Sequence, residues 1–301
     1  MLINASTLGP LFQGFSVAFQ KGFAGATPRY QDVSMIAPSS TSTTTYGWLG
    51  QLPTFREWLG DRVVNSLQAH GYAITNKSFE STVAVPRVAI EDDQYGLFGT
   101  LIGDMGQSAA VHPDQLIFTL LSGGTTALCY DGLPFFSAAH PVNMNNAATG
   151  TVANMDNGGA GPWWYLFDCS RVIKPLVWQN RIPYEFQPLT NPDDPNVFWR
   201  DEFVFGARGR GNAGFGLWQL AYGSNQPLDS AHYNAARAAM RALKGENNLP
   251  LGINPDTLVI GPSLESAGRT LINSELVPVG GAGVSNPWKD TAKLIITPWL
   301  P

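Results

Sequence analysis

One stretch of helical spacing, from residue 91 to residue 124, does most to limit what this chain can fold into. It opens at Glu91-Asp92-Asp93, continues with apolar residues three and four positions apart, and stops at Gly123-Gly124. Carboxylates suit a helix N-terminus because they complement the macrodipole, and Pro113 suits the first turn of a helix. The pattern therefore predicts a long central helix with one break, at Pro113.

A second helical pattern occupies residues 1–25, where Leu8, Phe12, Phe15 and Phe19 share one face. Glycines interrupt this segment and weaken the helix. We therefore expect its apolar side to be covered by another surface. The uncharged run Ser39–Thr45 follows and is typical of an extended linker. Such a beginning predicts an N-terminal arm rather than an independent domain.

The remaining pattern mixes strands and helices. Tyr72–Asn76 and Thr82–Val85 favour strands joined by a turn at Asn76-Lys77, while residues 141–162 are typical of a loop and 164–222 of several strands. Further along, a helix is expected at 231–243. A β-α-β unit follows, with strands at 257–260 and 293–297 around a helix at 263–271. The fold class is therefore α+β.

Charged residues are scarce: 18 Lys and Arg plus 23 Asp and Glu make 14% of the 301 residues, where about 25% is usual. Aromatic residues make 11%, and charge depletion with aromatic enrichment characterises protein–protein interfaces. The alternative is an aromatic-rich β protein with an uncharged polar surface. A net charge of -5 excludes a basic nucleic-acid-binding surface, and no apolar run is long enough for a membrane span.

Three groups could carry chemistry, and each has a simpler interpretation. Residues 209–214 match the pattern GxGxxG, but an aromatic, glycine-broken segment follows where a nucleotide-binding helix would be required, so a glycine-rich hairpin turn is expected. Cys129, Asp131 and His140 could form a thiol nucleophile with its base, yet Tyr130–Gly132 is typical of a turn. The four histidines lack zinc-ligand spacing. We expect no catalytic residue, no cofactor and no metal.

A cluster of mixed charge surrounds Trp58, formed by Arg56, Glu57, Asp61 and Arg62. It is either a solvated turn with ion pairs of little energetic value or a complementary surface that sets the register between subunits. The residues alone leave both interpretations open.

Several strings, in this order along the chain, resemble the major head (capsid) subunit family of Mu-like bacteriophages. They are Tyr46–Gly50, Glu57-Trp58, Gly60–Arg62, Asn76-Lys77, Phe79-Glu80, Glu91–Asp93, Met105-Gly106, Ala109-Ala110, His112–Asp114, Cys129–Gly132, Phe135-Phe136, His140-Pro141, Leu166–Arg171, Lys174-Pro175, Phe215-Gly216, Trp218-Gln219, Leu264-Glu265 and Ser285-Asn286. No single string has a known chemical meaning, but their order and spacing cover nearly the whole chain.

The resemblance implies the tailed-phage capsid fold of the Hong Kong 97 type, with an N-terminal arm, an extended β-hairpin loop, a peripheral domain with a spine helix, and an axial domain. Residues 1–45 would form the arm, 46–90 the extended loop, and 91–301 the two capsid domains. The implied function is a non-enzymatic major capsid protein that assembles with itself, as hexamers and pentamers, into an icosahedral shell around double-stranded DNA. A portal, a separate scaffolding protein and a decoration protein are its expected partners.

The resemblance also directs attention to possible subunit contacts. We expect contacts at Phe12 and Phe15 of the arm, covered by another subunit or by the chain's own spine helix. Others are expected in the extended loop, a ribbon of little independent stability, at Phe79, Glu80 and the charged cluster around Trp58. Two functional alternatives remain: another virion component, such as a decoration or tail protein, and a cysteine-dependent hydrolase.

Overall fold

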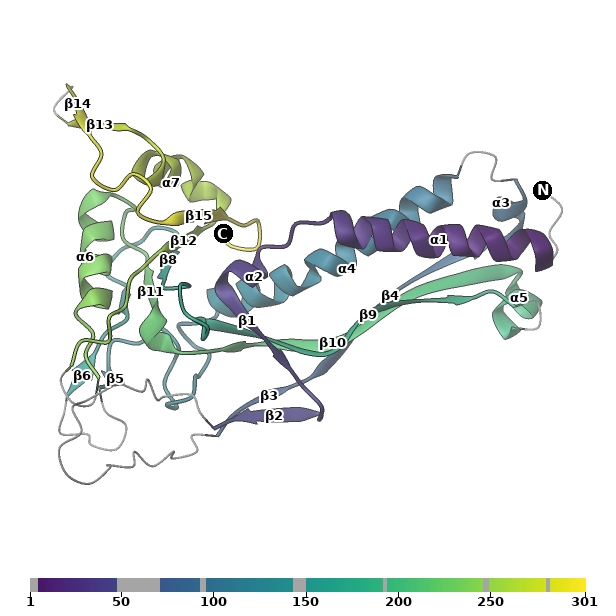
Figure 1. The fold of residues 1–301 in the computed structure, drawn as a ribbon, viewed down its shortest axis with the longest axis horizontal. Helices are drawn as coiled ribbons and strands as arrows, with labels where there is room; N and C mark the ends of the chain where they lie inside the picture. The colour runs from purple at the N-terminus through teal and green to yellow at the C-terminus, as the bar shows by residue number, and fades with distance from the viewer. Residues whose placement is uncertain are drawn as a thin grey trace.

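The two larger β-sheets, each covered by helices, lie at opposite ends of an elongated molecule (Figure 1). The computed structural model describes residues 5–47, 71–92, 96–142, 150–191, 194–245, 249–279 and 282–301. In this part of the chain, no helix is long and apolar enough to cross a membrane.

The four-stranded sheet forms the long arm of the molecule. Its strand order is β1 (Ser34–Pro38), β9 (Leu176–Leu189), β10 (Glu202–Phe215) and β4 (Lys77–Pro86). Strand β1 is parallel to β9, whereas β10 runs antiparallel to both β9 and β4. Because β9 and β10 each have 14 residues, this pair gives the molecule its length.

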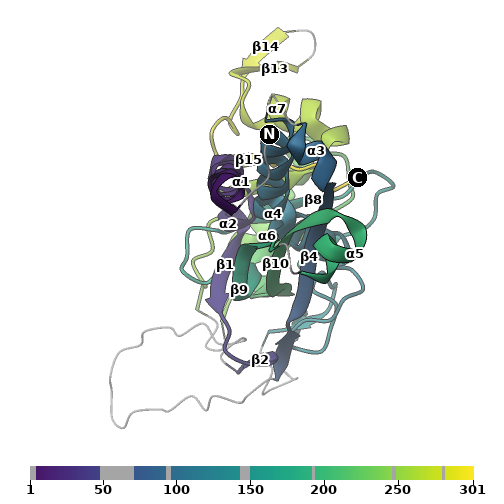
Figure 2. The ribbon, with the colours of Figure 1, turned by 90° about the vertical axis from the view of Figure 1, so that its right-hand side faces the viewer.

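Two long helices, α1 (Ala5–Gly25) and α4 (Leu97–Ser122), lie over one face of this sheet (Figures 1 and 2). Phe19 and Ile102 are fully buried between the helices and the sheet, together with Phe205 of β10. The predictions of an N-terminal helix and a long spine helix are therefore confirmed. The short helix α2 (Tyr30–Val33) links α1 to β1.

Two details of the spine helix differ from the expectation. The helix is continuous through Pro113, because buried residues on both sides of the proline, among them Met105 and Ile117, hold the two halves against the rest of the molecule. The acidic run does not form the N-terminus of this helix. Glu91 ends α3 (Arg87–Glu91), where it pairs with Arg87 at 3.3 Å, Asp92 follows it, and Asp93 lies outside the described residues.

The five-stranded sheet forms the other end. Its order is β15 (Lys293–Ile296), β12 (Thr257–Ile260), β8 (Trp164–Phe167), β11 (Ala221–Ser224) and β7 (Met155–Asp156). Helices α6 (Ser230–Arg241) and α7 (Glu265–Ile272), with 3-10 turns at Trp218–Leu220 and Pro262–Leu264, complete this end. The helix expected at 231–243 and the C-terminal β-α-β unit are confirmed, and the strands of 164–222 divide between the two sheets.

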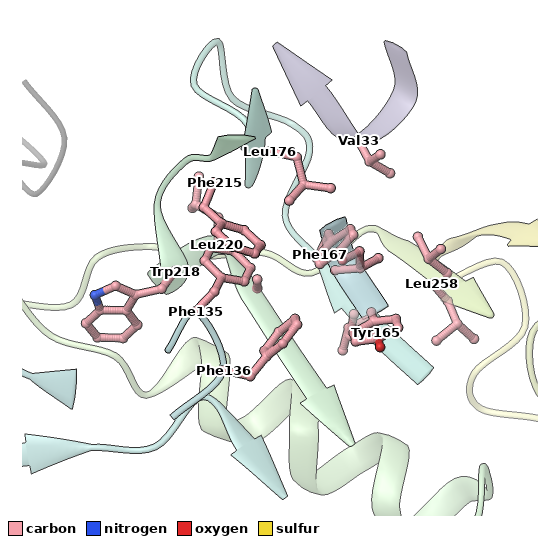
Figure 3. Close-up of a cluster of buried hydrophobic side chains, with 14 of the residues drawn as sticks. Val33, Phe135, Phe136, Tyr165, Phe167, Leu176, Phe215, Trp218, Leu220 and Leu258 are labelled. Atoms are coloured by element: carbon pink, nitrogen blue, oxygen red, sulfur yellow. The ribbon is translucent and has the colours of Figure 1, made fainter. Parts of the chain in front are cut away.

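The larger hydrophobic core lies where this sheet meets the loops after α4 and the near ends of β9 and β10 (Figure 3). Phe135 stacks on Phe215 with ring centroids 4.3 Å apart, and Phe136 stacks on Tyr165 at 5.2 Å. Many of the aromatic residues noted in the sequence therefore serve this core.

The expected hairpin around Asn76-Lys77 is wrong. Strand β3 (Tyr72–Thr75) pairs with β2 (Thr43–Tyr46), whereas β4 pairs with β10. The polar run Ser39–Thr45 is consequently not only a linker, because its second half is strand. Ile74 and Val85 are buried, at 3% and 1% exposure, so the segment from residue 72 onward belongs to the body of the molecule.

The expected glycine-rich turn at residues 209–214 is also wrong, because these residues lie inside β10. Close approach explains the glycines. A Cβ at Gly209 would meet the ring of Tyr184, and one at Gly211 would meet the Gln179 carbonyl and the Trp178 ring. The strand needs glycine at these positions because neighbouring rings and a backbone carbonyl leave no room for a Cβ atom.

Short elements fill the connections. Strands β5 (His140–Pro141) and β6 (Thr151–Val152) pair within the segment expected to be a loop. Helix α5 (Pro195–Arg200) connects β9 to β10 at the far end of the long sheet. Strands β13 (Leu276–Val279) and β14 (Ala282–Ser285) form a ribbon that projects beyond α7 (Figure 1).

Candidate subunit-contact surfaces

The charged cluster expected to contact other subunits, with Arg56, Glu57, Trp58, Asp61 and Arg62, lies outside the described residues. Phe79 and Glu80 are described and occupy β4. The Phe79 ring is half-buried and packs edge-on against the His112 ring, with centroids 4.5 Å apart. Glu80 is exposed and stands opposite Arg208 in the register of β4 with β10.

Phe12 and Phe15 pack inside their own chain. Phe15 is 3% exposed, and its ring meets Phe205 edge-on at 5.2 Å. Phe12 is half-buried and lies 5.4 Å from the Phe203 ring. This apolar face was expected to be covered either by another subunit or by the chain's own spine helix. Its own chain covers it, and β10 contributes as well as the spine helix.

A carboxylate fixes the chain just after α1 to the spine helix. Asp114, only 6% exposed, accepts hydrogen bonds from the backbone N–H groups of Arg29 at 2.9 Å and Tyr30 at 2.6 Å. Burial raises the pKa of Asp114 despite these hydrogen bonds. The contact joins residues far apart in sequence, so it holds α2 and the end of α1 against the spine helix.

Cys129, Asp131 and His140 do come together, with their possible ligand atoms all within 4.8 Å of one another. The Asp131 carboxylate lies between the other two. Its Oδ2 is 2.6 Å from His140 Nδ1, and its Oδ1 accepts the Cys129 thiol at 3.1 Å. His140 also stacks on Trp218 at 4.1 Å. The expected turn at Tyr130–Gly132 is present and brings the thiol to the carboxylate.

The electrostatics of this triad do not favour a thiolate nucleophile. Burial, together with the adjacent Asp131 charge, raises the pKa of the Cys129 thiol. Burial acts to raise the pKa of Asp131 too, but hydrogen bonds from His140 and Cys129 outweigh it and hold that pKa below the usual value. Because the thiol and the imidazole share one carboxylate, the arrangement is a closed hydrogen-bonded network that ties the turn to β5.

A cavity of about 360 Å³ lies between the N-terminus of α6, helix α7 and the base of β13. Its charged lining residue is Asp229, whose carboxylate accepts the backbone N–H groups of Ala231 and His232 at 3.0 and 2.9 Å. That carboxylate is therefore engaged in capping α6.

Two exposed aromatic residues at the far end of the molecule were not among the contact residues expected from the sequence. Phe198 and Trp199 of α5 are 71% and 79% exposed, and their rings meet edge-on at 5.0 Å. The signal available in the sequence is a pair of adjacent aromatic residues in a short segment between Asp194 and Asp201.

Comparison with known proteins places the whole chain in one family. The model of the family described as "Mu-like prophage major head subunit gpT" matches residues 8–300. The major capsid protein of Escherichia phage Mu is 39% identical over 100% of both chains. The Mu-like prophage FluMu major head subunit of Haemophilus influenzae is 37% identical over 96% of both.

Solved structures agree along the same length. A chain from the procapsid of bacteriophage JBD30 has a TM-score of 0.87 and 41% identity, covering 99% of this chain and 100% of that one. A chain from the JBD30 capsid has a TM-score of 0.79 and 31% identity, with full coverage of both. The resemblance and the capsid fold expected from the sequence are confirmed. The chain belongs to the Mu-like major head subunit family and is a major capsid protein, a component of the virion.

Proposed function

We propose that copies of this chain assemble, as hexamers and pentamers, into a closed head shell. The observation that carries this proposal is the full-length agreement with chains from the JBD30 procapsid and capsid. The exposed surface supports it: the chain exposes 15832 Å², against roughly 12,000 Å² for a compact monomer of this mass. Surface of this extent suits a subunit that neighbours cover.

The subunit would divide as the sequence suggested, with one revision. Residues 1–45 would form the arm, whose helix α1 packs on its own chain and whose strand β1 joins the four-stranded sheet. The candidate extended loop would be limited to the part of 46–90 that precedes β3. The four-stranded sheet with α4 would form the peripheral domain and the five-stranded sheet the axial domain. The charged cluster around Trp58, with Phe79 and Glu80, remains our candidate for contact with a neighbour.

The shell would enclose double-stranded DNA without sequence-specific binding. A net charge of -5 supports this, because a wall without excess cations does not hold the phosphate backbone tightly. Three further partners are proposed: a portal, a separate scaffolding protein and a decoration protein. One JBD30 capsid structure, 32% identical to this chain, is described as decorated with minor capsid protein trimers.

The family is structural, and we propose that this member has no enzymatic activity. The Cys129 thiol, the only candidate nucleophile the sequence suggested, is 5% exposed and hydrogen-bonded to Asp131. A cysteine-dependent hydrolase would need an accessible thiolate, which this environment disfavours.

Assembly is tested by purifying the protein and following it with concentration, using sedimentation and negative-stain electron microscopy of the same samples. Closed shells, tubes or hexameric capsomers are expected. A mock purification from cells without the gene controls for contaminating particles. A species that stays at 32.5 kDa at every concentration would contradict self-assembly and favour another virion role.

A further inference from the structure

Cys129, Asp131 and His140 form a buried group whose side chains can each bind a metal ion. Their possible ligand atoms all lie within 4.8 Å of one another. The side chains of Asp131 and His140 are 0% exposed, and Cys129 is 5% exposed. A neighbouring subunit cannot reach these side chains, so contacts within a shell do not account for the group.

The hydrogen bonds of His140 call for a proton on each ring nitrogen. Its Nδ1 lies 2.6 Å from Oδ2 of Asp131, and its Nε2 lies 3.3 Å from the carbonyl oxygen of Phe135. Because both neighbours are acceptors, both nitrogens must donate, and the ring is then an imidazolium. The thiol, the carboxylate and the imidazolium together carry no net charge.

A divalent cation can replace two of these protons without changing the buried charge. The Cys129 thiol proton and the His140 Nδ1 proton leave to solvent, and the cation bonds to the thiolate, the neutral imidazole and the carboxylate. Since a buried net charge is costly, a neutral exchange suits this site. Burial and the Asp131 charge raise the pKa of the Cys129 thiol, so the thiolate forms only when a cation is bound to it.

The surroundings hold the three ligands in the orientation that a metal site requires. A metal-binding histidine almost always donates its other ring N–H to an acceptor such as a backbone carbonyl, and here the Phe135 carbonyl is placed to accept it. Trp218 stacks on the His140 ring at an interplanar angle of 6°, which fixes the plane of the imidazole. The Leu133 backbone N–H donates to Oδ1 of Asp131 at 3.0 Å. Phe135 and Trp218 belong to the larger core (Figure 3), so these supports are rigid.

We propose that Cys129, Asp131 and His140 bind a zinc ion, which joins the turn at Tyr130–Gly132 to strand β5. A thiolate and an imidazole are zinc ligands, whereas magnesium and calcium prefer oxygen ligands alone. The expectation of no metal rested on the spacing of the histidines, and a site with a single histidine does not show in that spacing. The zinc ion is structural, because its ligands are buried.

The geometry needs only a small adjustment to accept the ion. Donor atoms around a tetrahedral zinc ion lie about 3.3–3.6 Å apart. The distance from Sγ of Cys129 to Oδ1 of Asp131 is 3.1 Å, and the 2.6 Å distance from Asp131 to His140 has to open by about 1 Å. One oxygen of Asp131 faces the thiol and the other faces the imidazole. A carboxylate that binds through both oxygens therefore completes a set of four donor atoms.

The first experiment measures the zinc content of the full-length protein. The wild type, Cys129→Ser and Cys169→Ser are expressed with zinc in the medium, purified without chelators and analysed by elemental mass spectrometry. Serine at position 129 keeps a hydroxyl group that can donate to Asp131 but removes the thiolate. Cys169→Ser is the matched control, because Cys169 is the other free cysteine and lies outside the group. We expect one zinc ion per chain in the wild type and in Cys169→Ser, and none in Cys129→Ser.

The second experiment identifies the ligands and measures the stabilisation. Cobalt(II) replaces zinc as the probe, because a thiolate bonded to cobalt absorbs in the near ultraviolet and four-coordinate cobalt absorbs strongly in the visible. We expect both absorptions in the wild type and in Cys169→Ser, and neither in Cys129→Ser. Zinc added to metal-free wild-type protein should raise Tm by roughly 4 °C at a free concentration 100 times Kd.

The wild-type measurements decide the proposal even if a variant fails to fold. A wild-type protein that contains no zinc and gives no thiolate–cobalt absorption overturns it, and the group is then a hydrogen-bonded network alone. A zinc-dependent rise of Tm that persists in Cys129→Ser also overturns it, because the ion would be bound elsewhere, for example at the surface pair Asp229 and His232. Neither measurement requires a shell, so the zinc site and the proposed assembly function are tested separately.

Discussion

The contact between helices α1 and α4 allows a prediction whose sign changes within a single helix. A Cβ added at Gly22 of α1 would overlap the backbone carbonyl of Gly103 in α4, and one at Gly106 would overlap the carbonyl of Phe19. The helices therefore meet backbone to backbone, and neither carbonyl can move aside as a flexible side chain could. Gly14, also in α1, has nothing within 4 Å of its hypothetical Cβ.

We predict that Gly22→Ala destabilises the subunit, while Gly14→Ala stabilises it. Overpacking costs about 1–3 kcal/mol, and a backbone obstacle places Gly22 at the upper end of that range. Alanine returns about 1 kcal/mol at either site, because glycine is the poorer helix former. The net changes are a loss of about 2 kcal/mol for Gly22→Ala and a gain of up to about 1 kcal/mol for Gly14→Ala.

Thermal unfolding of the free subunit measures both changes. The unfolding entropy of a chain of 301 residues is about 0.6 kcal/mol per kelvin, so Tm should fall by roughly 3 °C for Gly22→Ala and rise by roughly 1–2 °C for Gly14→Ala. The reasoning is refuted if Gly22→Ala melts at or above the temperature of Gly14→Ala. In that case the helices are not in backbone contact.

Three further predictions concern other parts of the subunit. Asp131→Asn should lower the free energy of unfolding by about 3 kcal/mol, because it leaves the buried His140 without its carboxylate. The pKa of Asp131 is lowered in the folded state. The ionised carboxylate therefore stabilises the fold at pH values above the usual pKa of Asp, and this stabilisation is lost as the pH falls below that value. The variant lacks the carboxylate, so its Tm should fall less in acid than that of the wild type. Ellman titration should detect two thiols per chain in denatured, unreduced protein, because Cys129 and Cys169 are free. Both should react slowly in the native subunit, since Cys129 is buried, Cys169 is half-buried, and burial raises the pKa of both thiols. An intrachain disulfide would contradict this. Replacing residues 276–285 with a short Gly-Ser turn should leave Tm within about 1 °C of the wild-type value. Among the described strands, β13 and β14 pair only with each other, and an isolated ribbon contributes little stability. A larger fall in Tm would show that the ribbon packs on the rest of the subunit.

The helices were predictable because their signal is local. The spacing of Phe12, Phe15 and Phe19 specifies one helical face wherever the segment packs, and the same holds for the spine helix. The continuity of that helix through Pro113 was not predictable. A proline destabilises a helix locally by about 3 kcal/mol. Only the tertiary structure shows that burial of residues such as Met105 and Ile117 compensates for this destabilisation.

The pairing of strands is not a local property, and the strand pairing predicted from the sequence was wrong. Tyr72–Asn76 and Thr82–Val85 each favour a strand, but nothing near them states that β3 joins β2 and that β4 joins β10. Similarly, GxGxxG suggested a turn because glycine is common in turns. Its true cause is contact with the Tyr184 and Trp178 side chains, which lie in the neighbouring strand β9.

The contact surfaces were harder to predict than the family for the same reason. Aromatic enrichment marks both a core and an interface, and only the fold separates Phe215, stacked on Phe135 in the core, from Trp199, exposed on α5. The expectation of a ribbon with little independent stability is wrong for β4, a described part of the candidate extended loop, and fits a different segment. Leu276 and Val284 are 60% and 45% exposed on a two-stranded ribbon, whereas Ile74 and Val85 are buried. A segment that favours strands is marginal only if no sheet accepts it, and that depends on partners more than a hundred residues away, since β4 pairs with residues 202–211.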